Sequence, residues 1–236
     1  MVADNCSPAR LYLVRHGQAS LGSDDYDRLS ELGHLQSQAL GERLRAELSE
    51  DRLKPWRGTL KRHRQTLSRC ALSVEPVIDP ALNEYTVDGL MRSAVGQAER
   101  LGLVPPDDAA FAEPAAYLAT FLAWFPEVLS AWQSARLDCE HNGSWRAFHQ
   151  RVLSPVDSWQ LQLAAGDSPV VVTSAGVIST LIAALLEKDL AWQRELNLSL
   201  YNASISTLEW HPAAGWRPGI LNCVQHLDGR LTHTLA

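Results

Sequence analysis

An arginine, a histidine and a glycine follow directly after a short apolar run near the start of the chain. Leu11 to Val14 is typical of a strand buried on both faces, and Arg15, His16 and Gly17 come next. A guanidinium presents a planar fork of donors that matches phosphate oxygens. A neutral imidazole is a nucleophile near pH 7, and glycine lets the backbone approach a bulky anion closely. The triplet predicts a phosphate cradle with a nucleophilic histidine, although by itself it fits a solvated loop with a structural histidine equally well.

A second turn has the same layout but no ionisable group. The apolar run 170–172 leads into Ser174, Ala175 and Gly176. Ligands of parallel sheets lie beyond the carboxyl ends of the strands, so neighbouring strands would bring the two turns to one crevice.

The remaining pattern alternates strand-like and helical segments. Strands are predicted at 11–14, 53–58, 77–78, 170–172, 204–210 and 219–224, and helices at 31–48, 60–72, 109–138, 144–163 and 177–186. This alternation predicts an α/β three-layer sandwich with a mostly parallel central sheet and right-handed crossovers.

Particular residues set the predicted boundaries of these elements. Ser30 is a plausible N-cap, and Pro55 would place its strand at an edge of the sheet or end it early. Residues 86–108 show no clear period and are interpreted as loop. Proline is expected to interrupt the later helices, and we take 86–140 as a lid-like insertion in a single domain, residues 1–236.

Composition excludes several classes of function. The chain has 236 residues, 46% hydrophobic and 20% charged, and a net charge of −6, which argues against a nucleic-acid or anionic-membrane surface. The four cysteines form no CxxC pair, and no leader or membrane span is evident, so we expect reduced thiols in the cytoplasm. The histidines show no metal-ligand spacing, and no phosphate-loop or dinucleotide motif occurs, so neither a metal nor a cofactor is expected. The oligomeric state stays open.

Five stretches in order resemble one family. LYLVRHGQAS (11–20) resembles the signature of the histidine phosphatase superfamily, the phosphoglycerate mutase-like proteins. LSELGHLQSQALG (29–41) is similar to its first helix, and GTLKRHRQT (58–66) to its second phosphate-arginine segment. ALNEY (81–85) is similar to the segment that carries its proton donor, and NASISTLEW (202–210) to a late strand.

This resemblance implies hydrolysis of a small phosphomonoester in two steps. His16 would form a phosphohistidine while Arg15 and Arg62 hold the phosphoryl oxygens. Glu84 would protonate the leaving oxygen and then activate water, which requires a raised pKa. Without the family, Glu84 would read as a surface carboxylate and Arg62 as part of a solvated basic run. A mutase is disfavoured because nothing identifies a bisphosphoglycerate pocket.

The sequence departs from the family at Ala175, where the usual turn is Ser-His-Gly. The family's second histidine also touches the phosphoryl group, and loss of one such donor typically costs about 10²- to 10³-fold in rate. A remodelled site could use His63, another side chain or the backbone N–H groups at Gly176. Adjacent residues on a helix diverge by about 100°, which argues against His63 unless the turn is irregular.

The alanine at position 175 also fits two alternatives to a remodelled site. An experimenter could have introduced it, or the protein could be a catalytically silent relative that binds a phosphorylated ligand or regulates another protein. Because the nucleophile His16 is present, we expect a natural branch that lacks the second histidine and retains weakened activity.

Overall fold

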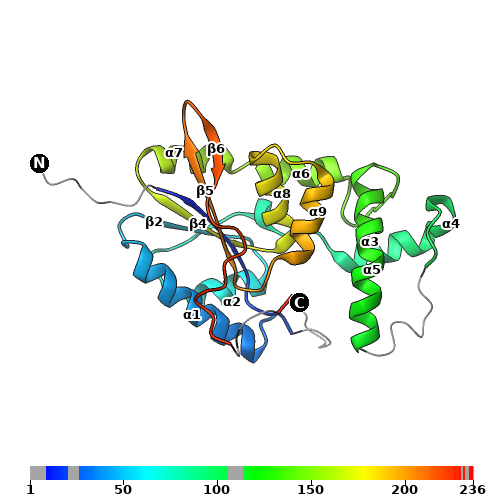
Figure 1. Ribbon diagram of the computed structural model, residues 1–236, viewed down its shortest axis with the longest axis horizontal. Coiled ribbons are helices and arrows are strands. Elements are labelled where there is room, and N and C mark those ends of the chain that lie inside the picture. Colours follow the sequence, from blue (N-terminus) through cyan, green and yellow to red (C-terminus); the bar gives the residue numbers. More distant parts are fainter. Residues whose placement is uncertain (1–8, 21–26, 106–113, 230, 232–233, 236) are drawn as a thin grey trace, which may run out of the picture.

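A six-stranded sheet forms the centre of the computed structural model, which describes residues 9–20, 27–105, 114–229, 231 and 234–235, with the backbone alone for 114–122. The strands lie in the order β3-β2-β4-β1-β5-β6 (Figure 1). They are β1 (Leu11–Arg15), β2 (Leu53–Arg57), β3 (Val77–Ile78), β4 (Ser168–Thr173), β5 (Ile205–His211) and β6 (Gly215–Pro218). The pairs from β3 to β1 are parallel, whereas β5 and β6 run antiparallel. The predicted α/β fold with a mostly parallel sheet is confirmed.

Helices cover both faces of this sheet (Figure 1). They are α1 (Glu31–Glu47), α2 (Lys61–Arg69), α3 (Val87–Gly96), α4 (Ala98–Leu101), α5 (Pro114–Gln133), α6 (Trp145–Leu153), α7 (Val156–Ala164), α8 (Ala175–Leu185) and α9 (Leu190–Ser199), with a 3₁₀ turn η1 (Pro80–Leu82). None of the described helices is both long and apolar enough to cross a membrane.

Alternation along the strands divides the core into two layers. Leu11 and Leu13 of β1 pack into the larger cluster, with side chains from α3 to α9. Tyr12 and Val14 point to the opposite face and pack against α1 and α2. Successive residues of a strand face opposite sides of a sheet, so this single apolar run serves both layers.

The structure agrees with the predicted cap at Ser30 and revises the role of Pro55. The Ser30 hydroxyl accepts a hydrogen bond from the N–H of Gly33 at 3.0 Å and so caps α1. Pro55 lies in a strand that has neighbours on both sides. Pairing with β3 begins only at Trp56, so the missing N–H of Pro55 leaves no ladder bond unmade.

Residues 86–108 were expected to be loop but contain α3 and α4. The buried face of α3 consists of Leu90 and Ala94, one helical turn apart, which is too short a stripe to give a visible period. Helix α5 continues through Pro126 because Phe125, Val128 and Leu129 around it are buried in the core.

Two further boundaries differ from the prediction. The segment 144–163 forms two helices, α6 and α7, with Pro155 at the start of the second. A strand was expected at 219–224, but the strand that pairs with β5 is β6, at residues 215–218, because the turn between them is short. Residues 219–224 still follow β5, through the Gly219 N–H to Thr207 O bond at 2.9 Å and the isolated bridge between Ile205 and Cys223.

Helices α1 and α2 are in backbone contact, and this contact generates a stability prediction. A Cβ at Gly41 of α1 would lie 2.3 Å from the carbonyl oxygen of Cys70, whereas a Cβ at Gly96 of α3 would meet nothing within 4 Å. Gly41→Ala should therefore lower the free energy of unfolding by about 1–3 kcal/mol through overpacking. Gly96→Ala, the matched control, should leave it unchanged or raise it by about 0.4–1 kcal/mol. Urea unfolding of both variants measures the difference, and equal effects would contradict the contact.

Candidate active site

The turn after β1 is held by contacts from the neighbouring strand and from both adjacent helices. The N–H of His16 donates to the carbonyl of Thr173 at 2.9 Å, and the N–H of Gly17 donates to the hydroxyl of Thr66 on α2 at 3.0 Å. A Cβ at Gly17 would lie 2.4 Å from the carbonyl oxygen of Gly33 on α1. Glycine is therefore required here for packing against α1, a more immediate reason than close approach to an anion.

The imidazole of His16 is fixed in one tautomer by its own backbone. Its Nδ1 lies 2.7 Å from the carbonyl oxygen of Gly17, which can only accept, so Nδ1 carries the proton. The Nε2 atom of the neutral ring is then an unprotonated lone pair. Burial lowers the pKa of His16 well below its ordinary value, and the nearby Arg62, Arg15 and His63 lower it further. The ring is neutral at pH 7.

Two guanidinium groups stand beside this ring. Arg15 is buried and donates to the main-chain carbonyls of Leu200 and Leu235, the latter at 2.6 Å. Arg62 donates to the carboxylate of Asp27 at 2.8 Å, and its side chain is 11% exposed against 31% for Asp27. Both cations lower the pKa of His16 and of Glu84, which places them in the electrostatic field of both groups.

Glu84 follows η1 and meets the start of α8. Its Oε2 accepts a hydrogen bond from the N–H of Gly176 at 2.7 Å. Burial raises the pKa of Glu84, and the Gly176 N–H and the Arg62 and Arg15 cations oppose the rise. A Cβ at position 176 would lie 2.5 Å from the Glu84 carboxylate, so only glycine admits this contact.

Tyr85 connects Glu84 to the helical region. Its ring packs edge-on against Trp132 of α5 and Phe148 of α6, with centroids 5.3 and 5.2 Å away. Its hydroxyl accepts from the side chain of Asn197 on α9 at 2.9 Å. These contacts fix the backbone that carries Glu84.

His63 lies in the site, contrary to the argument from helical geometry. Its ring centroid is 5.8 Å from that of His16, and its Nε2 is 2.8 Å from the hydroxyl oxygen of Ser174. Residues 62 and 63 both reach the site because they occupy the first turn of α2, whose N-terminal end approaches the strand ends. The angle of about 100° between adjacent side chains separates them less at the end of a helix than along its side.

The four residues expected to carry the chemistry are thus brought together, and others join them that sequence reasoning did not assign. The Asp27 carboxylate, which pairs with Arg62, gave no signal in a run of loop aspartates. Ser174 was interpreted only as a turn residue. Within the described residues, no group of three His, Cys, Asp or Glu side chains could hold a metal ion.

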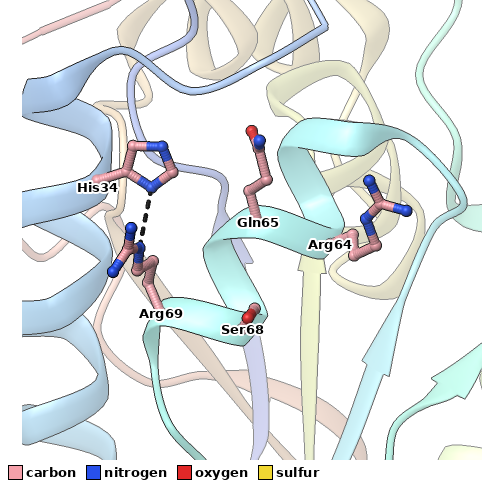
Figure 2. A pocket seen from close by; sticks show the side chains of 5 residues that line it. All are labelled: His34, Arg64, Gln65, Ser68 and Arg69. Atoms are coloured by element: carbon pink, nitrogen blue, oxygen red, sulfur yellow. Dashed lines mark hydrogen bonds between the residues drawn. The ribbon is translucent and has the colours of Figure 1, made fainter.

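A separate pocket lies between α1 and α2. Figure 2 shows the side chains that line it, from one helix on each side: His34, Arg64, Gln65, Ser68 and Arg69. Nε of Arg69 donates to Nδ1 of His34 at 3.2 Å across it. None of the residues around His16 lines this pocket, so it is distinct from the candidate active site.

Comparison with solved structures supports the fold. A mycobacterial glucosyl-3-phosphoglycerate phosphatase, solved with inorganic phosphate, is 24% identical, with a TM-score of 0.63 over 93% of this chain and 100% of that one. Phosphoserine phosphatase from Entamoeba histolytica is 15% identical, with a TM-score of 0.61 over 93% and 99%. YhfR of Bacillus stearothermophilus is 21% identical, with a TM-score of 0.62 over 92% and 98%.

Sequence comparison extends this likeness to the family. No curated protein matches the chain. Residues 11–100 and 116–222, which include both turns at the strand ends, match the histidine phosphatase superfamily, branch 1. The chain therefore belongs to the histidine phosphatase superfamily.

Proposed function

We propose that the protein hydrolyses a small phosphomonoester through a phosphohistidine on His16. The bond from His16 Nδ1 to the Gly17 carbonyl carries this proposal, because it leaves Nε2 as a lone pair in a neutral ring. Family membership and the phosphatases among the structural neighbours support it.

The reaction proceeds by two in-line transfers. In the first, His16 Nε2 forms a bond to phosphorus as the bond to the ester oxygen breaks, and Glu84 gives its proton to that oxygen. In the second, the Glu84 carboxylate takes a proton from water, whose oxygen attacks phosphorus and releases the histidine. Arg15 and Arg62 hold the equatorial oxygens and offset their charge in both steps.

Substrate selection belongs, in this proposal, to the helices inserted between residues 86 and 140. Helices α3 and α5 contact each other, and α5 contacts α6 and α9. Through Tyr85 they adjoin the backbone that carries Glu84. We infer that they act as the lid over a small phosphorylated substrate, and these contacts with the backbone that carries Glu84 support that role.

Removal of the nucleophile tests the central step. His16→Ala should abolish acid-labile phosphate incorporation from labelled phosphomonoesters and lower turnover by about 10³-fold or more. His34→Ala, on α1 and outside the site, is the matched control and should behave as wild type. Labelling that persists in His16→Ala would place the nucleophile elsewhere. Saturable binding of phosphate esters by the wild type, without labelling or turnover, would instead favour the catalytically silent relative.

Glu84→Gln tests whether the leaving group needs a proton from Glu84. The glutamine carbonyl can still accept from the Gly176 N–H but has no proton to give. We expect kcat/KM to fall about 10²-fold for an alkyl phosphate and far less for p-nitrophenyl phosphate, whose leaving group needs no proton. Equal losses for both esters would show that Glu84 is not the acid.

The pKa shifts predict the shape of the pH profile. His16 must be neutral, and because its pKa is lowered, kcat/KM should fall only at pH values well below the ordinary histidine range. Glu84 must be protonated, and because burial raises its pKa, the fall at high pH should begin above the ordinary glutamate range. Steady-state kinetics from about pH 3 to 9 measure both limbs. In Glu84→Gln, assayed with an alkyl phosphate, the residual activity should lack the alkaline limb and keep the acid limb.

A further inference from the structure

Ser174 stands beside His16 at the ends of two paired strands. Arg15 is the register partner of Thr173, and the His16 N–H donates to the Thr173 carbonyl, so the residues that follow are neighbours as well. Adjacent strands lie about 4.8 Å apart. A phosphoryl group on His16 would therefore lie within reach of the Ser174 side chain.

The hydroxyl of Ser174 does not make the hydrogen bond expected of a serine at the start of a helix. Ser174 is the N-cap of α8 and has the extended backbone of an N-cap, yet its side chain makes no capping bond. A serine at this position normally accepts from an N–H of the first turn. Here the carboxylate of Glu84 takes the N–H of Gly176 instead. The hydroxyl is directed to His63 at 2.8 Å.

The tautomer of His63 determines which way the Ser174 proton points. The ring is fully buried, and Nδ1 has no hydrogen-bond partner. That atom faces the Cα of Gly58, because a Cβ built there would lie 2.5 Å from it. A buried N–H without an acceptor is rarer and more costly than a buried lone pair, so the proton belongs on Nε2. Burial and the cations of Arg62 and Arg57 lower the pKa of His63, which keeps the ring neutral.

In this tautomer His63 donates to Ser174, and the serine must donate elsewhere. A hydroxyl has one proton, and its oxygen is already the acceptor for Nε2–H. The proton is therefore turned away from the ring of His63, and the strand register places His16 beside Ser174 on the neighbouring turn. A hydroxyl oriented in this way offers one donor to an anion.

From this geometry we propose that Ser174 is a further catalytic residue, whose hydroxyl donates a hydrogen bond to an oxygen of the transferring phosphoryl group, and that His63 positions it. The inference rests on the proposed function and adds a third donor to the two arginines. No covalent bond to Ser174 forms. The bond to a charged oxygen is stronger than a neutral one, and it strengthens further as charge develops on the phosphoryl oxygens. The pair supplies, from the N-cap of α8 and from α2, a donor that Ala175 cannot supply.

Kinetics of single and double variants test the proposal. Ser174→Ala should lower kcat about 10²-fold with a smaller change in KM. His63→Ala should show a loss of the same kind, and His63→Gln should recover part of it, because its amide N–H can replace Nε2–H. The double variant Ser174→Ala, His63→Ala should be no slower than Ser174→Ala, because His63 acts through the serine. Ser179→Ala, a buried serine of α8 whose hydroxyl bonds to the Gly176 carbonyl and to the side chain of Gln193, is the matched control and should keep wild-type kcat.

The outcomes that overturn the proposal are separate from those that overturn the proposed function. Unchanged or raised kcat in Ser174→Ala would show that the hydroxyl turns its lone pairs to the substrate. Additive losses in the double variant, or no recovery by His63→Gln, would reduce His63 to a packing residue. If the wild type neither turns over nor becomes labelled, the proposed function fails, and the affinity for inorganic phosphate decides this inference. Ser174→Ala should then raise the Kd about 10-fold, and an unchanged Kd would refute the donor.

Discussion

The in-register parallel pairing of β1 with β4 is the constraint on which the site depends. Arg15 and Thr173 are register partners, so the turns that follow β1 and β4 begin side by side at one edge of the sheet. The His16 N–H bond to the Thr173 carbonyl continues the ladder one residue beyond the strand. A slip of one residue would turn every side chain of β1 to the opposite face and exchange the two core layers. The buried faces thus fix the register, and the register fixes the relative positions of the two turns of the candidate active site.

Burial and positive charge shift the pKa of His16 in the same direction, but they shift the pKa of Glu84 in opposite directions. For His16 both effects disfavour the cation, so the ring stays neutral, as the proposed nucleophile must be. For Glu84 burial favours the protonated acid, while Arg62, Arg15 and the Gly176 N–H favour the carboxylate. A group that must give a proton in one step and take one in the next benefits from such a balance. The two arginines that we propose as ligands of the phosphoryl oxygens therefore also lower the pKa of both His16 and Glu84.

The sequence was informative where a local rule decides the outcome, in the fold as in the site. Ser30 as N-cap and the doubly buried β1 run were predictable because capping and burial leave signatures in a few adjacent residues. The helix α3 was missed because its buried stripe is two residues long. Pro55 was misread because its tolerance depends on where β3 begins to pair, which is a property of another segment.

His63 was discounted on the angle between adjacent helical residues, a rule that holds along the side of a helix. Helix α2 instead directs its N-terminal end to the strand ends, and the direction of its axis comes from packing across the sheet, which no window of sequence contains.

The ion pair between Arg62 and Asp27 fixes the position of a buried cation at the candidate active site. A guanidinium that is 11% exposed would be unstable without a negative partner. Asp27 provides one from a more exposed position, and its second oxygen accepts the N–H of Lys61 at 2.9 Å, at the start of α2. A single carboxylate therefore fixes both the start of α2 and the side chain of Arg62, which extends from it. A phosphate dianion, with more charge and more oxygens than a carboxylate, is the type of ligand that such an arrangement favours in exchange.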